Sequence, residues 1–212
     1  MRLMRLMKYT HACVRLEKDG QALVIDPGEW SEPDALLGAA AVLVTHEHVD
    51  HVDAEVLHAA QTGNPSLVVH TNAAVAAQLG EKGVTAQTVG AGDTFTAAGF
   101  SVSVVGGEHA EIYEGLPGCA NVGFVVDAGL YHPGDALFVP EADVETLLVP
   151  VSAPWLKLAE AIDFVRAVRP RRAFPIHDAL FSDLGRRLVD RWIDGKGGTD
   201  YGRLAPGESV EV

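Results

Sequence analysis

A histidine-rich segment is the part of this sequence best suited to chemistry. The run Thr-His-Glu-His-Val-Asp-His follows directly on the apolar residues 40–44, which are typical of a strand buried on both faces. In an extended chain, side chains two residues apart point to the same side, so His46 and His48 can reach one point. Asp50 and His51 lie where the chain turns into a helix, and they can face a second point close by. Imidazole nitrogens and carboxylate oxygens are ligands that suit zinc, iron or manganese.

Three further side chains of the same kinds come just after predicted strands. His109 follows the strand expected at 100–105 and a flexible Gly-Gly pair, and Asp135 stands in His-Pro-Gly-Asp after the strand expected at 130–132. His177 stands in Pro-Ile-His-Asp after the strand expected at 172–176. Ligands delivered from the same edge of several strands are the usual arrangement of an α/β active site. We therefore expect these three residues to complete the metal site.

The elements that must position these side chains alternate between short apolar strands and helices. No clean boundary divides the two halves, so we expect a single α/β domain of packed layers over residues 1–212. Asp53, Asn72 (or Thr71) and Ser182 are the expected helix N-caps. Strands are expected at 8–16, 22–25, 40–44, 66–70, 85–89, 100–105, 121–126, 130–132, 146–149 and 172–176, and helices at 53–60, 72–80, 157–168 and 182–194.

Composition excludes several classes of protein. The 212 residues are 48% apolar and 21% charged, which predicts a compact soluble domain and excludes a disordered chain. No apolar run is long enough for a membrane span, and residues 1–10 lack the apolar core of a secretory signal. The two cysteines, Cys13 and Cys119, exclude a disulfide framework and favour a reducing cytoplasm. We expect both to be small buried apolar groups.

The charge balance argues against nucleic acid as a partner. The net charge is −13, and residues 17–160 carry 21 acidic groups against three basic ones. An acidic body repels polyphosphate, and the arginines after residue 165 fit a solvated helix face better than a nucleic-acid surface.

The order of these motifs strongly resembles the metallo-β-lactamase-fold hydrolases along the whole chain. The resemblance implies an αββα sandwich with two metals at one edge of the paired sheets. It also implies that Asp26, in Ile-Asp-Pro-Gly, orients the ligand loop without binding metal. By the same match one metal is held by His46, His48 and His109, the other by Asp50, His51 and His177, and Asp135 bridges the two.

Within the superfamily, three short motifs resemble the branch of ascorbate-6-phosphate lactonase-like and uncharacterised metal-dependent hydrolases. They are Thr-His-Ala at 10–12, Asn-Val-Gly-Phe at 121–124 and Tyr-His-Pro-Gly-Asp at 131–135. True zinc β-lactamases place cysteine or histidine where Asp135 stands. Flavodiiron proteins replace the second histidine, here His48, by glutamate. Glyoxalase II adds a helical domain for which this chain has little room.

Such a site implies hydrolysis. Two divalent ions, zinc or else manganese, iron or nickel, can hold a bridging water whose pKa falls to about 7. The hydroxide attacks a carbonyl carbon or a phosphorus, and Asp50 takes the proton and passes it to the leaving group. The cations can also attract an anionic small molecule into an acidic protein. A small ester, lactone or related carbonyl compound is the expected substrate. Phosphodiester hydrolysis of the ribonuclease Z type and a non-catalytic metal-binding scaffold are the alternatives.

Substrate contacts are less sharply indicated. His132 could touch substrate or be an ordinary hydrogen-bonded histidine, and the role of His11 is equally open. Trp155 and Lys157 could offer an indole wall and an ammonium to a substrate with an apolar and an anionic part. Alternatively, Trp155 packs on the sheet and Lys157 is a surface charge. The long loop 106–120 is a candidate lid.

Overall fold

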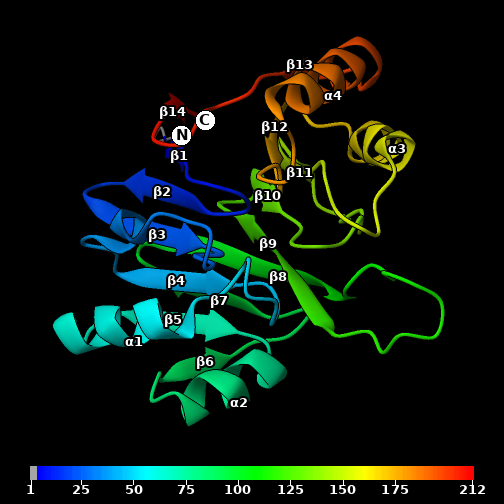
Figure 1. Ribbon diagram of the computed structural model, residues 1–212. Helices are drawn as coiled ribbons and strands as arrows, with labels where there is room; N and C mark the ends of the chain where they lie inside the picture. The colour runs from blue at the N-terminus through cyan, green and yellow to red at the C-terminus, as the bar shows by residue number, and fades with distance from the viewer. Residues whose placement is uncertain (1–3) are drawn as a thin grey trace.

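Two seven-stranded sheets packed face to face form the body of the protein (Figure 1). The computed structural model describes residues 4–212, so the expected start of the domain at residue 1 lies outside it. The first sheet has the order β14-β1-β2-β3-β4-β5-β6, and β3 to β6 run parallel to one another. Its strands are β1 (Arg5–Lys8), β2 (Val14–Lys18), β3 (Gln21–Ile25), β4 (Ala41–Val44), β5 (Val68–Thr71), β6 (Ala86–Thr88) and β14 (Ser209–Glu211).

The second sheet has the order β13-β12-β11-β10-β9-β8-β7. Strands β10 to β13 are parallel, whereas β7 to β10 are antiparallel hairpins. Its strands are β7 (Thr94–Ala97), β8 (Phe100–Glu108), β9 (Ala120–Val126), β10 (Leu130–His132), β11 (Thr146–Pro150), β12 (Arg172–Ile176) and β13 (Asp200–Tyr201).

Helices cover the outer face of each sheet and complete an αββα sandwich, as expected. The helices α1 (Ala54–Gly63) and α2 (Ala73–Glu81) lie on the first sheet, and α3 (Leu158–Val168) and α4 (Asp183–Lys196) lie on the second (Figure 1). A short 3-10 helix, η1 (Pro33–Leu36), precedes β4. The expected N-caps are confirmed, since the side chains of Asp53, Asn72 and Ser182 each accept backbone N–H groups of the helix that follows.

Three apolar layers hold this arrangement together. Strand β4 shows why its sequence is continuously apolar: Ala41 and Leu43 face the core between the sheets, while Val42 and Val44 face the core beneath α1 and α2. The third layer lies between the second sheet and α3 and α4. Its largest members include Tyr131, Leu147, Phe164 and Ile193.

The start of the chain departs from the expected strand 8–16. Strand β1 ends at Lys8 and β2 begins at Val14, and a turn closed by the Tyr9 N–H on the Cys13 carbonyl (2.9 Å) separates them. His11 sits in this turn with a φ of 63°, in the left-handed region. Side chains of the turn are buried as well, so the alternating apolar pattern continues through it. For this reason the pattern alone did not reveal that two strands are present. Strand β7 was also not expected.

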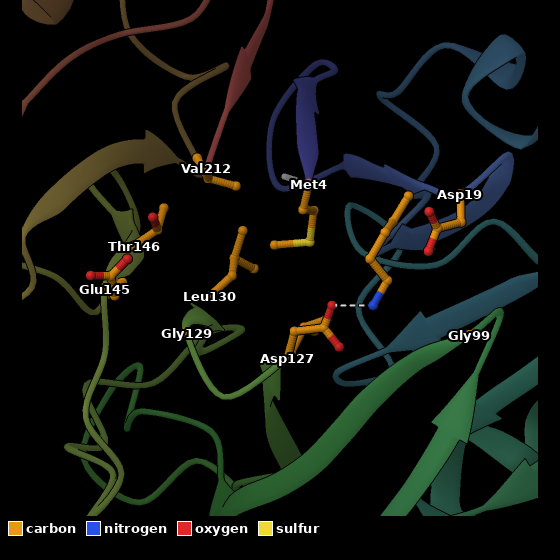
Figure 2. Close-up of a pocket in the computed structure, with 11 residues that line it drawn as sticks. Met4, Asp19, Gly99, Asp127, Gly129, Leu130, Glu145, Thr146 and Val212 are labelled. Carbon is orange, nitrogen blue, oxygen red and sulfur yellow. Dashed lines mark hydrogen bonds and ion pairs between the residues drawn. The ribbon is translucent and has the colours of Figure 1, made fainter. Parts of the chain in front are cut away.

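A cavity of about 290 Å³ lies at the end of the sandwich where β10 and β11 begin (Figure 2). Lys18 crosses it to pair with Asp127, and its ammonium lies 4.5 Å from the centre of the Phe100 ring. The predicted metal ligands come after the opposite, carboxyl ends of the strands, and none of these ligands lines the cavity. Along residues 4–212, no helix is long and apolar enough to cross a membrane.

Candidate metal centre

The predicted ligands converge at one end of the sandwich, each from the segment that follows the carboxyl end of a strand. Their ligand-type atoms form two groups, in each of which all atoms lie within 4.8 Å of one another. The first group comprises His46, His48, His109 and Asp135, and the second comprises His11, Asp50, His51 and His177. All seven predicted ligands are thus brought together, and His11 is an addition.

In the first group, three ring nitrogens and a carboxylate oxygen lie close together. His46 Nε2 lies 3.1 Å from His48 Nδ1, as the two-residue spacing predicts for a short extended segment. His109 Nε2 lies 3.4 Å from Asp135 Oδ2. His109 comes from the end of β8, whereas the other two histidines follow β4, so the two sheets share this group.

Asp135 also reaches the second group. Its Oδ1 lies 3.1 Å from His51 Nε2, and its Oδ2 lies 3.1 Å from His177 Nε2. Asp50 Oδ2 completes this side, at 3.3 Å from His177 Nε2 and 3.9 Å from His51 Nε2. Because Asp135 Oδ2 lies close to a ring nitrogen of each group, His109 at 3.4 Å and His177 at 3.1 Å, this carboxylate occupies the position expected of a bridging ligand.

The outward-facing ring nitrogens of the histidines are held by acceptors, which orients the rings. Nδ1 of His51 donates to Asp26 Oδ2 at 2.7 Å, that of His109 to the Ala110 carbonyl at 2.6 Å, and that of His177 to the Ser152 carbonyl. A nitrogen that donates outward leaves the other with its lone pair pointing inward. These three rings therefore turn Nε2 toward the centre, where it can offer its lone pair to a metal ion once it carries no proton.

Asp26 lies behind the cluster, as expected. Besides His51, its carboxylate accepts the backbone N–H and the hydroxyl of Thr45, both at 2.8 Å. The Thr45 oxygen in turn lies 3.0 Å from His46 Nδ1. One buried carboxylate thus orients one histidine of each group and fixes the start of the ligand loop.

Burial and close charges shift the protonation of the centre. Burial, reinforced by the charge of His51, holds the pKa of His46 well below its usual value, so this ring is neutral. For His177, burial alone would lower the pKa, but the carboxylates of Asp135 and Asp50 outweigh it and raise the pKa to about 9. Asp135 and Asp26 raise the pKa of His51 in the same way, against its burial.

The residues fit a metal centre. Three buried nitrogens, Nε2 of His51, His109 and His177, and the buried Asp135 Oδ1 make no hydrogen bond of acceptable geometry. Unpartnered buried polar atoms are costly and rare in native proteins, and here they all point to one place. Neutral imidazoles and carboxylates are the donors that divalent transition metals prefer.

The three predicted substrate contacts lie in different environments. Trp155 lies at the centre, since its indole N–H donates to Asp135 Oδ2 at 3.1 Å. Lys157 does not reach the cluster; its side chain is 84% exposed and its ammonium lies 3.5 Å from Glu160. The expectation that His132 contacts substrate is contradicted. That ring is fully buried, with Nε2 on the Ala12 carbonyl (3.0 Å) and Nδ1 accepting the Gly134 N–H (3.2 Å).

Two other expectations change in detail. Strand β8 runs to Glu108 and β9 begins at Ala120, so the loop expected at 106–120 is shorter and extends away from the sheets (Figure 1). Of the two cysteines, Cys13 is buried, and burial raises its thiol pKa to about 12; Cys119 is half-buried.

Similarity to known proteins agrees with this geometry. Residues 5–177 match the family described as the beta-lactamase superfamily domain. Rv0786c of Mycobacterium tuberculosis is 38% identical, over 98% of this chain and 99% of that protein. A UPF0173 metal-dependent hydrolase of Methanocaldococcus jannaschii is 26% identical, over 82% and 83%. Igni18, a metallo hydrolase of Ignicoccus hospitalis, shares the fold with a TM-score of 0.77 at 20% identity, over 99% and 98% of the two chains.

The chain therefore belongs to the metallo-β-lactamase superfamily. It is a metal-dependent hydrolase of that superfamily, and its clustered histidines and aspartates are the side chains that would bind the metal.

Proposed function

We propose that this enzyme holds two divalent metal ions, zinc in the simplest case, and hydrolyses a small ester, lactone or related carbonyl compound. The convergence of the two groups on Asp135 carries this proposal. His46, His48 and His109 would hold one ion, Asp50, His51 and His177 the other, and Asp135 would lie between them. When bound, such ions ionise a water molecule near neutral pH and polarise the oxygen of a carbonyl group.

The protein's own groups supply proton transfer. The Asp50 side chain is 16% exposed, so it is the carboxylate of the second group that solvent and substrate can reach. Hydrogen bonding from His11, together with His177, outweighs burial and holds the Asp50 pKa well below its usual value, which keeps it ionised. In this ionised form Asp50 has lone pairs that can accept the proton of the attacking water, and its low pKa favours release of that proton to the leaving group.

Two indoles flank the centre and favour a small carbonyl substrate with an apolar part. The Trp30 ring packs edge-on against His11 with ring centres 4.7 Å apart, and the Trp155 ring lies 6.0 Å from that of His109. Flat apolar walls beside a polar centre suit an uncharged acyl or lactone group. Attraction of an anionic substrate would come from the metals themselves, because Lys157 points to solvent. The placement in the ascorbate-6-phosphate lactonase-like branch is part of this proposal and rests on the short motifs alone.

A metal analysis combined with a substrate panel tests the proposal. We expect two metal ions per chain, turnover of p-nitrophenyl acetate and simple lactones, and little turnover of bis-p-nitrophenyl phosphate. Asp50→Asn keeps a ligand oxygen but cannot take a proton, so kcat should fall by about 10²–10⁴-fold. The exposed Asp143→Asn is the matched control and should leave kcat unchanged.

The alternatives give different results. Activity on the phosphate diester without any on esters or lactones would assign a phosphodiesterase. Stable metal binding without turnover of either class, and no kinetic difference between Asp50→Asn and the control, would assign a metal-binding scaffold.

A further inference from the structure

His11 differs from the other histidines of the second group in how its outward nitrogen is used. Nδ1 of His51 and of His177 donates to an oxygen. Nδ1 of His11 instead accepts the backbone N–H of Ala179, at 3.4 Å. An imidazole nitrogen that accepts a hydrogen bond carries no proton. In the neutral His11 ring, the proton is therefore on Nε2.

The protonated nitrogen faces Asp50. His11 Nε2 lies 3.0 Å from Asp50 Oδ2, a normal distance for a donated hydrogen bond. A nitrogen that carries a proton has no lone pair to offer a metal. From this geometry we infer that His11 is not a fourth ligand of the second group but a positioning residue, whose Nε2–H holds the carboxylate of Asp50 in place. The inference rests on the proposed function, in which Asp50 is both ligand and proton acceptor.

The fold fixes His11 on its backbone as well as on its ring. The His11 carbonyl accepts a hydrogen bond from the Lys8 ammonium at 2.6 Å and another from the backbone N–H of His177 at 3.2 Å. Lys8 is buried, with 3% of its surface exposed, and its ammonium also lies 3.6 Å from Asp178. These contacts hold the left-handed conformation of His11, which a residue with a Cβ rarely adopts.

The fixed position of His11 places its ring beside the Asp50 carboxylate. Asp50 Oδ2 is the atom that His11, His51 and His177 all approach, so a carboxylate that turned away would leave the second group. Trp30 packs against the His11 ring. A hydrogen bond shielded by an indole is stronger than one in water. His11 therefore orients the carboxylate without occupying a coordination position.

Three variants separate positioning from ligation. His11→Phe removes the donor and keeps the ring shape, His11→Ala removes both, and His11→Gln restores an N–H donor near the position of Nε2. We expect all three to keep the wild-type number of metal ions, because none of them removes a ligand. We expect His11→Phe and His11→Ala to lower kcat by about 10–100-fold with little change in KM. His11→Gln should lose less of the kcat, because its side chain again offers an N–H donor. His58→Phe, on α1, is the control.

A direct measurement on the metal-loaded wild type does not depend on activity or on folding of a variant. Long-range ¹H–¹⁵N NMR distinguishes protonated, unprotonated and metal-bound ring nitrogens, and His11 should show a protonated Nε2. A metal-bound Nε2, or the loss of one ion per chain in His11→Phe, would make His11 a ligand and overturn the inference. An unchanged kcat in folded His11→Phe and His11→Ala would overturn it too. Failure of the proposed function is distinct, since then the wild type itself lacks bound metal or ester hydrolysis.

Discussion

At the residue scale, the state of each histidine is decided by the group behind it. His51, His109 and His177 donate outward through Nδ1, which leaves Nε2 for a metal ion, whereas His11 accepts outward and turns a protonated Nε2 to the centre. The same residue type is thus suited to be a metal ligand or a hydrogen-bond donor within one cluster. Asp26 influences both groups, because its carboxylate accepts a hydrogen bond from His51 in the second group and one from Thr45, which contacts His46 in the first.

Replacing Asp26 by Asn should weaken metal binding without removing a ligand. The amide is uncharged, and its NH₂ group cannot accept the hydrogen bonds that Oδ2 receives from His51 and Thr45. Loss of such a supporting group typically costs 10–100-fold in metal affinity, which is the expected result here. Competition with a chromogenic chelator measures the affinity. Asp143→Asn is the control, and equal affinities of the two variants would contradict the role of Asp26.

At the scale of elements, the residues of the site lie in the segments that follow strand ends. Close backbone packing between these segments fixes their positions. Gly28 shows this best. A Cβ atom built on Gly28 would lie 2.1 Å from the backbone carbon and oxygen of Asp50, so the Asp-Pro-Gly segment after β3 touches the ligand loop after β4 directly. The Glu29 N–H also donates to the Val49 carbonyl at 2.7 Å.

The substitution Gly28→Ala should therefore displace the Asp50–His51 segment. Backbone atoms cannot move aside as a flexible side chain can, so the ligand loop must shift and the second group is lost while the first keeps its ligands. We expect the bound metal to fall from the two ions per chain that we propose towards one, as measured by elemental analysis of gel-filtered protein. Gly80→Ala, in α2 with nothing within 4 Å of the new Cβ, is the matched control. Full metal content in Gly28→Ala would contradict this close contact.

At the scale of the whole molecule, the centre exists only where the two sheets meet. The first sheet contributes His11, the ligand loop and Asp26, and the second contributes His109, Asp135 and His177. Metal bound to both sides must therefore stabilise the packing of one sheet on the other, since a ligand that binds only the folded state raises its stability. In the metal-free protein, protonated His51 and His177 beside Asp50 and Asp135 provide part of that attraction.

Because the two sheets share these charged side chains, the stability of the metal-free protein should depend on pH. The His177 pKa is raised to about 9 in the folded state and the His51 pKa is also raised, against about 6.5 in the unfolded chain. Their contribution is complete below pH 6.5 and is lost as the pH rises towards 9. With chelator present, we expect Tm to fall over this interval.

The metal-loaded protein is the control for that experiment. Metal replaces the protons on His51 and His177, so its affinity rises with pH over the same interval. The difference in Tm between the Zn²⁺-loaded and metal-free forms should therefore widen from pH 6.5 to 9. A metal-free Tm that stays constant or rises over this interval would show that these histidines are not protonated in the folded state.

Residue types and their spacing were enough to predict the candidate ligands, their order along the chain and the layered fold. These follow from local properties: the two-residue spacing in His46-Glu47-His48, apolar runs followed by polar strand ends, and side chains that cap helices. The environments of His11 and His132, by contrast, follow from contacts between distant parts of the chain. His132 is enclosed by the fold, and His11 takes its proton position from Ala179, which lies 168 residues further along the chain. The direction of a hydrogen bond depends on which groups meet in space, and residue types along a chain do not contain that information.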